Sequence, residues 1–525
     1  MTSLKKFIFF LLLIISIPAW ATTSHYTLAY RDDPATTITI GWSGDDGIVY
    51  YGTQDFGINY TSYPQNHASD RMATHKGQNR KFTRLTGLSP NTVYYFVIHD
   101  NNNNTSQRFK FQTLSDNPND PVSFVSGGDT RDGFSLLGVY IEDCPSGDCR
   151  QRRKDGNQIV SKIRPDFVAF NGDFIQNQIT SDVTQEWNNW LDDWQLSISA
   201  DGKIYPIVLT QGNHEDNSDM YNIFDIPQDE YYVLDIHSGL FRFYSLNSEI
   251  GACDATQLAW FTNDLQNHTG SASAPIWKIV QHHHPTYAMA LYGLNQDQMD
   301  CWVGEFESYN VDLVMESHSH TTKWSWPCVK NSTNDGYEID TLDGIVYIGE
   351  GQWGAPHRNL DYTGSSQKAW IRDQNVFDNF FYIRVSQDTI QIENVSFENI
   401  SSIANIYDDQ LGSFLPNGTT TWNPSNGNVI YITKTNSDVA EQQNSVTDIF
   451  PNPSKSIVYI NFNKILNNNT IEVYNSLGKL CIKEELYQQN SYELNMKKLC
   501  SGVNYIIIKN DKGHVESHKV IKIDP

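Results

Sequence analysis

The stretch Lys203-Ile-Tyr-Pro-Ile-Val-Leu209 is followed, after two residues, by Gly212-Asn213-His214-Glu215. The first part is an apolar run of the length of one buried strand. The second part is a polar turn, and its glycine lets the backbone bend sharply where the strand ends. The stretch therefore predicts a strand that presents functional side chains at its carboxyl end, as strands of α/β sheets do.

The same pattern of an apolar run and a polar turn occurs five times between residues 120 and 396. The runs are Val122–Ser126, Asp166–Phe170, Lys203–Leu209, Trp277–Val280 and Val311–Met315. The turns are Gly128-Asp129-Thr130-Arg131, Gly172-Asp173, Gly212-Asn213-His214-Glu215, His282-His283-His284-Pro285 and His318-Ser319-His320. Helix-like stretches fall between the runs, and this alternation predicts an α/β domain.

One helix-like stretch, Thr184–Leu196, carries Trp187, Trp190 and Trp194. Because their spacing of three and four residues places them on one helical face, we expect them to pack in the core.

We expect the five polar turns to meet at one site, because ligands collect at the carboxyl ends of strands in such sheets. Asp, Asn and His supply oxygen and imidazole ligands, which suit Fe, Zn or Mn better than a thiolate-seeking metal. A carboxylate can bridge two ions about 3.5–4 Å apart, and such a pair of ions stabilises both the attacking and the leaving oxygen in a displacement at phosphorus. The ordered set predicts two metal ions and hydrolysis of a phosphoester by metal-activated water.

The regions on either side of this domain read as β-structure. Residues 24–115 alternate with Gly, Asp and Asn turns, and Gly87-Leu-Ser-Pro-Asn-Thr-Val-Tyr94 resembles the corner of fibronectin type III-like sandwiches. Residues 397–447 are rich in turn residues and predict a linker. Residues 448–525 return to short alternating strands and predict a small β-sandwich.

Residues 1–21 have the pattern of a signal peptide. Lys5 and Lys6 precede the apolar run Phe7–Ile17, and Ala19-Trp20-Ala21 is a small-x-small cleavage site. No later run is long enough to span a bilayer, so we expect an exported protein without a transmembrane segment. Seven cysteines form no paired CxxC zinc site, and a Cys144–Cys149 disulfide is compatible with export.

The net charge of the 525-residue chain is −24. So acidic a protein repels phosphate backbones, which argues against a nucleic-acid scaffold.

The five ordered motifs resemble those of calcineurin-like metallophosphoesterases, in particular purple-acid-phosphatase-like enzymes, whose series is GDxG, GDxxY, GNH(D/E), VxxH and GHxH. Many of these enzymes also carry a fibronectin-like N-terminal domain. The resemblance implies a four-layer αββα catalytic domain over residues 120–396 and a secreted, acid-phosphatase-like phosphomonoesterase acting on small phosphorylated substrates. A phosphodiesterase or nucleotidase on the same fold and a catalytically inactive surface-binding protein remain alternatives.

The resemblance also implies roles for single residues. Asp129 and His320 would bind the first metal, Asp173 would bridge both, and Asn213, His283 and His318 would bind the second. His283 is chosen because Val280-Gln-His-His283 fits VxxH. His214 would contact the phosphate or protonate the leaving group, and His284 would face the substrate. Arg131 either grips a phosphoryl oxygen or forms an ion pair at the domain edge.

The chain departs from the family pattern at three positions. Arg131 stands where the family has Gly, Gln176 where it has the tyrosine that ligates ferric iron, and Ser317 where it has Gly. Water, Gln176 or Asn177 are the alternatives for the tyrosine's place. The later Gly349–Pro356 stretch resembles a glycine-rich loop of the family, so that Trp353 and His357 line either the substrate entrance or a structural turn.

The tail resembles the type A C-terminal sorting domain of the Bacteroidota type IX secretion route. The matching pieces are Phe450–Ser454, Ile471–Lys479, Leu499–Tyr505 and Lys519–Ile523. The resemblance implies passage through the periplasm, contact with the type IX machinery, and a secreted or cell-surface protein. An ordinary small β-sandwich binding module is the alternative.

Overall fold

In the computed structural model the chain forms two compact units, Met1–Lys434 and Thr435–Pro525. The structure describes residues 23–136, 139–142, 144, 148–177, 182–270, 274–406, 415–434, 446–450, 454–466, 469–475, 479–487, 489–499, 501–509 and 515–523. The expected signal peptide lies outside the described residues.

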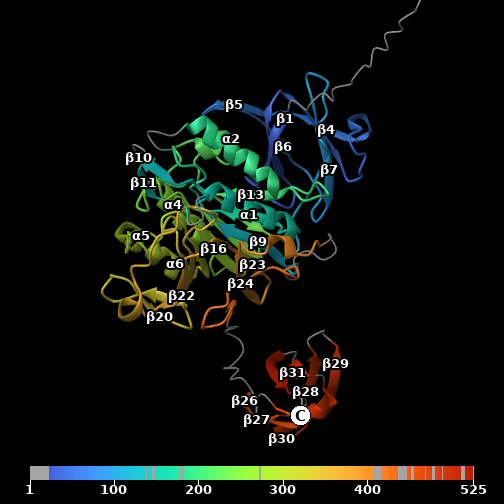
Figure 1. Cartoon of the computed structure of the whole chain (residues 1–525), viewed down its shortest axis with the longest axis vertical. Helices are drawn as coiled ribbons and strands as arrows, with labels where there is room; N and C mark the ends of the chain where they lie inside the picture. Colours follow the sequence, from blue (N-terminus) through green and yellow to red (C-terminus); the bar gives the residue numbers. More distant parts are fainter. Residues whose placement is uncertain are drawn as a thin grey trace, which may run out of the picture. The chain divides into compact units, whose positions relative to one another are not determined.

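The first unit contains a ten-stranded mixed sheet, several strands of which are labelled in Figure 1. In spatial order its strands are β25 (Ile430–Thr433), β24 (Thr389–Ser396), β23 (Asn379–Val385), β9 (Val122–Gly127), β12 (Phe167–Phe170), β13 (Pro206–Leu209), β1 (Thr23–Ala29), β2 (Ile38–Gly44), β6 (Gln78–Leu85) and β5 (Arg71–His75). Strands β9, β12 and β13 are parallel neighbours, so their carboxyl ends share one edge.

A second sheet of seven strands lies against the first. Its order is β14 (Tyr232–Ile236), β15 (Phe241–Ser245), β16 (Trp277–Gln281), β17 (Leu313–Met315), β21 (Val346–Gly349), β18 (Thr322–Ser325) and β22 (Ile371–Asn375). Phe124 of β9 packs between Phe167 and Phe243, at ring-centroid distances of 4.8 and 5.8 Å, which joins the two sheets in one core.

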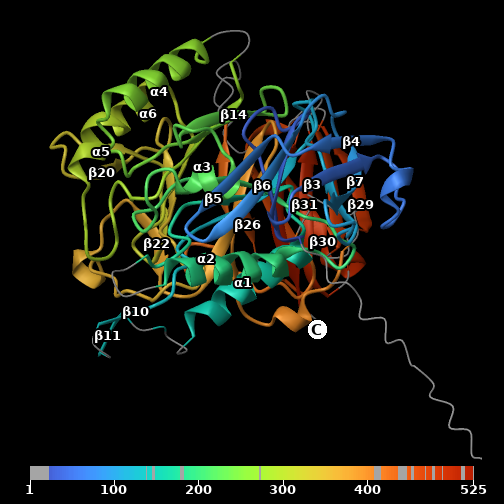
Figure 2. The ribbon, with the colours of Figure 1, turned by 90° about the horizontal axis from the view of Figure 1, so that it is seen from above.

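Helices cover the outer faces of both sheets. The helices are α1 (Cys149–Ile163), α2 (Val183–Trp194), α3 (Asp219–Phe224), α4 (Ala255–Asn267), α5 (Gln296–Cys301) and α6 (Val303–Ser308). Along β16, Ile279 belongs to the core between the sheets, whereas Val280 packs with Phe261 of α4 and Phe306 of α6. In both views α4 to α6 lie on the side of the unit opposite the N-terminal strands (Figure 2). The expected four-layer αββα arrangement is confirmed.

The N-terminal region adds a four-stranded sheet of β4 (Gln65–Ala68), β3 (Gly47–Gly52), β7 (Val93–Asp100) and β8 (Phe109–Gln112). The Tyr94 hydroxyl accepts a hydrogen bond from the Ser89 amide at 2.9 Å, which makes a tyrosine corner. Its other sheet is not separate, because β1 pairs in parallel with β13, Leu28 opposite Pro206. The N-terminal strands therefore continue the sheet that carries the motifs.

Part of the interval expected to be a linker is built into the same unit. Strand β25 pairs with the otherwise open edge of β24, and Ile403 and Ile430 are buried in the core. The described residues between 397 and 434 are therefore part of the first unit and not a simple linker. Strand β25 supplies hydrogen-bond partners to the backbone at the edge of β24, which would otherwise be open.

The three tryptophans of α2 are buried as expected, at 0 to 1% exposure, and Trp190 stacks on Trp194 at 5.4 Å. Two disulfides, Cys144–Cys149 and Cys253–Cys301, close loops of the first unit. Two short hairpins, β10 (Phe134–Leu136) with β11 (Val139–Glu142) and β19 (Cys328–Lys330) with β20 (Tyr337–Ile339), lie outside the main sheets.

The second unit is all β, as expected. One sheet contains β26 (Val446–Phe450), β27 (Ile457–Leu466) and β30 (Gln489–Asn495), and the other contains β29 (Leu480–Leu486), β28 (Asn469–Asn475), β31 (Gly502–Lys509) and β32 (Val515–Lys522). Val458, Ile471 and Ile506 contribute to a buried core of its own. Among the helices of the described ranges, none has both the length and the apolarity needed to cross a membrane.

Candidate metal centre

The polar turns follow strands of both sheets and meet at one edge. Asp129 follows β9, Asp173 follows β12 and Asn213 follows β13, whereas His283 and His318 follow β16 and β17. The strands that carry them are parallel to their neighbours, so every turn lies at a carboxyl end. The sheet order therefore explains why residues as far apart in sequence as Asp129 and His318, which are separated by 189 positions, come together.

Two groups of possible metal ligands share one carboxylate. Asp173, His283 and His318 form the first group, and Asp129, Asp173 and His320 form the second. Within each group the ligand atoms lie within 4.8 Å of one another, and all five residues are buried. Asp173, the carboxylate expected to bridge, is the residue common to both groups.

Backbone carbonyls fix the protonation of two of these histidines. His283 Nδ1 donates to the Asn171 carbonyl oxygen at 2.8 Å, and His320 Nδ1 donates to the Pro356 carbonyl oxygen at 2.7 Å. A carbonyl only accepts, so Nδ1 carries a proton in each ring and Nε2 is the nitrogen that faces the cluster, where it could ligate a metal ion. Metal-ligating histidines are commonly oriented in this way.

The atoms that face one another at the centre are mostly acceptors. His283 Nε2 lies 3.1 Å from Asn213 Oδ1, 3.2 Å from Asp173 Oδ1 and 3.3 Å from His318 Nδ1. His320 Nε2 lies 3.1 Å from Asp129 Oδ1, which accepts no hydrogen bond from any described residue. Buried acceptors drawn so close together require a positive charge between them, and oxygen and imidazole donors fit Fe, Zn or Mn.

The surroundings shift the pKa values of His283 and His318 in opposite directions. Burial alone lowers the pKa of His283, but the Asp173 and Asp129 carboxylates outweigh it and raise the pKa to about 9. Burial, with the neighbouring His284 and His283, lowers the pKa of His318 well below its usual range. The negative charge of the site is therefore concentrated at the two aspartates, where a cation is best held.

Glu215 holds the bridging aspartate in place, a role that the sequence reasoning did not assign. Its carboxylate accepts hydrogen bonds from the amides of Asp173, Phe174 and Gly212 at 2.8 to 3.0 Å. Burial and the Asp173 charge raise the pKa of Glu215 to about 8. Its position directly after the Asn213-His214 pair was the available signal.

The turns are tightly packed and conformationally unusual. Asp129, Asp173, His318 and His320 all have φ between 53° and 74°, a region that costs free energy for residues other than glycine. A Cβ on Gly212 would overlap Asp173. Gly212 therefore allows the backbone to approach Asp173 closely. The left-handed backbone conformation is adopted by Asp173 itself.

Arg131 lies inside the cluster and not at the domain edge. Its side chain is 1% exposed, and its Nε is 3.6 Å from Asp173 Oδ2. Its Nη1 donates to Gln176 Oε1 at 2.6 Å. Gln176 thus directs its amide oxygen at Arg131, in the place where the sequence pattern lacks a tyrosine.

His214 and His284 flank the cluster. His214 Nδ1 donates to the Gln176 carbonyl oxygen at 2.5 Å, which leaves Nε2 facing Asp173 Oδ2 at 3.8 Å. The ring of His284 lies 3.9 Å from that of His318, and its Nε2 is 3.3 Å from Glu249 Oε1. His282, the residue before His283, packs on Trp302 with ring centroids 5.1 Å apart.

The loop after β21 supports the site from behind. Trp353 is fully buried against Phe170 and Phe380, so it belongs to the core and not to an entrance. Its amide donates to the Gly128 carbonyl oxygen, and the Ala355 amide donates to that of Asp129. Of the two expectations for this loop, a substrate entrance or a structural turn, Trp353 fits the structural turn.

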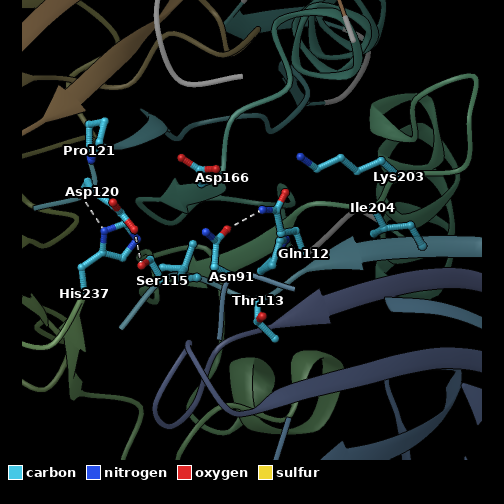
Figure 3. A pocket seen from close by; sticks show the side chains of 12 residues that line it. Asn91, Gln112, Thr113, Ser115, Asp120, Pro121, Asp166, Lys203, Ile204 and His237 are labelled. Carbon is cyan, nitrogen blue, oxygen red and sulfur yellow. Dashed lines mark hydrogen bonds between the residues drawn. The ribbon is translucent and has the colours of Figure 1, made fainter. Parts of the chain in front are cut away.

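A separate cavity of about 290 Å³ lies where the N-terminal strands meet β13 (Figure 3). Asp120, Asp166, Lys203 and His237 are among its lining residues. None of the ligands of the metal centre lines it, so it is distinct from the candidate site.

Family models match three consecutive parts of the chain. Residues 23–113 match the purple acid phosphatase N-terminal domain, residues 98–322 match calcineurin-like phosphoesterases, and residues 448–523 match the secretion system C-terminal sorting domain. The middle of the chain is thus similar to the calcineurin-like phosphoesterase family. The family uses a dinuclear metal centre, which agrees with the two ligand groups that share a carboxylate.

Relatives of the phosphoesterase domain include purple acid phosphatases. Purple acid phosphatase 23 of Arabidopsis thaliana is 24% identical over 67% of this chain and 78% of its own length. An uncharacterized protein of Mycobacterium tuberculosis, Rv2577, is 22% identical over 61% of this chain, which spans 66% of that relative. Purple acid phosphatase PPD1 of yellow lupin shares the fold at a TM-score of 0.58 and 14% identity, over 78% of this chain and 74% of its own.

Proposed function

We propose that the protein is a secreted phosphomonoesterase that hydrolyses small phosphate esters with two bound metal ions. The observation that supports this most directly is Asp173, shared by two groups of Asp and His ligand atoms at the carboxyl ends of β-strands. The phosphoesterase domain and the purple acid phosphatase relatives support the same class of reaction.

In this proposal Asp129 and His320 hold the first ion, Asp173 bridges, and Asn213, His283 and His318 hold the second. Fe, Zn or Mn fits the donor set. Such ions supply an activated water and orient the phosphorus centre.

The chain's own side chains bind and orient the ester. The Arg131 guanidinium attracts an anionic phosphoryl oxygen from beside Asp173. His214 directs Nε2 at the cluster while Nδ1 remains on the Gln176 carbonyl, so Nε2 is the atom that would contact a phosphate oxygen or donate a proton to the leaving-group oxygen. His284 borders the substrate beside His318.

A monoester fits this arrangement better than a diester. A monoester dianion carries one more negative charge than a diester, and the buried Arg131 supplies a cation that offsets it. Comparing kcat/KM for an aryl phosphate and a bis-aryl phosphate tests the choice. A preference for the bis-aryl substrate would indicate a phosphodiesterase.

Metal content and turnover of the purified protein test the proposal as a whole. About two ions per chain and aryl phosphate hydrolysis are expected, and Asp173→Ala and His320→Ala should each lower kcat at least about 1000-fold with loss of metal. His268→Ala is the matched control, because the His268 ring bonds to Asp264 at the end of its own helix, and His268 is not a ligand of the proposed centre. Near-wild-type turnover in both site variants, or a metal-free and inactive wild type, contradicts the proposal; the latter outcome favours a binding protein.

We infer that the chain passes through the periplasm and leaves the cell by the type IX route, on the basis of the sorting domain. Fractionation of a host with that route should place the full chain outside the cell or at its surface. A chain lacking residues 448–525 should accumulate in the periplasm. Export of both chains to the same extent would contradict the inference.

A further inference from the structure

A short hairpin, residues 286–295, borders the metal centre. Tyr287 pairs with Leu294, the Ala288 amide donates to the Gly293 carbonyl oxygen at 2.7 Å, and the Asn295 amide donates to that of Thr286 at 2.8 Å. The chain thus leaves His283 and His284, folds back, and presents residues 290–292 at its tip.

Two carboxylates, the buried Glu350 and the exposed Asp361, and a serine of the metal-binding turn hold this tip. Glu350, itself paired with Lys323, accepts the Met289 amide at 2.9 Å, and Asp361 accepts the Leu291 amide at 2.7 Å. Ser319, between the two histidines of its motif, donates to the Ala290 carbonyl oxygen at 3.1 Å. The tip is therefore fixed to the same turn that positions His318 and His320.

The two side chains at the tip are the most exposed of the hairpin. Ala288, Met289 and Ala290 are fully buried, whereas Leu291 and Tyr292 are 65% and 53% exposed. Leu291 also has φ of 64°, which is strained for a leucine. Exposed apolar side chains on a rigid, strained backbone next to a catalytic cluster are typical of functional sites.

Tyr292 lies directly beside the metal ligands. Its ring centroid is 4.4 Å from that of His318, and the Arg358 guanidinium carbon lies 5.7 Å from it. Arg358 in turn donates to the His318 carbonyl oxygen at 2.6 Å. A phosphate held at the cluster would therefore place its organic substituent within reach of this ring.

We propose that Leu291 and Tyr292 bind the leaving group and give the enzyme a preference for phosphomonoesters of flat aromatic alcohols or nucleosides over those of small alkyl alcohols. The inference rests on the proposed phosphomonoesterase function. A fixed aromatic ring stacks on a second ring at little entropic cost. Contacts with the part of a substrate that does not react contribute to kcat/KM by holding the ester in position.

The test compares kcat/KM for an aryl phosphate and for glycerol phosphate in the metal-loaded full chain. Tyr292→Ala should reduce the aryl-to-glycerol ratio of kcat/KM about fivefold, whereas Tyr292→Phe should retain it because the ring remains. Leu291→Gly removes the other apolar side chain at a backbone angle that glycine adopts without strain, so it should also lower the ratio. Leu342→Ala is the matched control, since Leu342 is 77% exposed outside the hairpin.

An unchanged ratio in Tyr292→Ala, or an equal loss on both substrates, would overturn the inference and leave the phosphomonoesterase function standing. An equal loss accompanied by loss of metal would show that Tyr292 only supports His318. A wild type that hydrolyses neither ester overturns both proposals.

Discussion

At the residue scale, the site combines metal-ligand atoms with one buried cation. Arg131 and Gln176 bond to each other beside the bridging carboxylate, at positions where the family pattern has glycine and tyrosine. The pair places a positive charge beside Asp173 and beside the residue that stands in the position of the pattern's tyrosine. We therefore propose that the phosphoryl group is held here partly by a guanidinium.

Arg131→Gln removes that cation while keeping a hydrogen-bond donor. We expect kcat/KM for an aryl phosphate to fall about 100-fold, the usual effect of losing one charge-stabilising donor, with the metal content retained. Steady-state kinetics with metal analysis measure this. Arg150→Gln is the control, because Arg150 pairs with Asp193 on the helix side. A decrease in kcat/KM of less than about threefold would indicate that Arg131 has only a structural role.

At the element scale, the loop after β21 packs against Asp129 and determines its position. Gly351 has φ of 75°, and the Asp129 carboxylate occupies the space that a Cβ on Gly351 would need. Loop and aspartate are also joined by the hydrogen bond from Ala355 to the Asp129 carbonyl oxygen. The glycine-rich stretch thus serves close packing behind a metal ligand.

Gly351→Ala should therefore displace Asp129 and lower both first-ion occupancy and kcat at least tenfold. Gly364→Ala is a close control, since Gly364 has φ of 57° but nothing lies within 4 Å of its added Cβ. Both variants carry a similar backbone penalty, so metal analysis and turnover isolate the clash with Asp129. Equal behaviour of the two variants would contradict this account.

At the scale of the whole molecule, the N-terminal strands hold the segment that follows the Asn213-His214 turn. Arg31, Arg71 and Arg84 converge on Asp225, which is fully buried at the end of α3; the Arg84 Nε to Asp225 Oδ2 distance is 2.7 Å. Together with the β1–β13 pairing, this cluster joins the N-terminal region to the catalytic sheet. The two regions should unfold together.

Asp225→Asn removes the charge that these arginines share. We expect a loss of about 3 kcal/mol in the free energy of unfolding, because breaking a buried ion cluster leaves uncompensated charges. Asp229→Asn, at an exposed aspartate nearby, should change stability by less than about 0.5 kcal/mol. Urea unfolding followed by tryptophan fluorescence measures both. A single transition is expected for the first unit, and two transitions would contradict the shared sheet.

The sequence by itself determined the fold class and the candidate ligands, because each apolar run and its polar turn are local patterns with a fixed physical meaning. The alternation of apolar runs with helix-like stretches predicted the α/β domain, and the spacing of the α2 tryptophans predicted their core position. The resemblance to the VxxH motif selected His283. The tail was recognisable for the same reason, since its short strands and turns are read locally.

Only the tertiary structure decided how distant residues meet. The sharing of one sheet by the N-terminal and catalytic regions depends on β1 pairing with β13, which no local pattern specifies. The support of Asp173 by Glu215, the Arg131–Gln176 pair and the position of Tyr292 beside His318 likewise depend on contacts between separate turns. The two-residue period of a strand determines which side chains lie on the same face of a sheet. The packing of the two sheets determines which of these side chains contact one another.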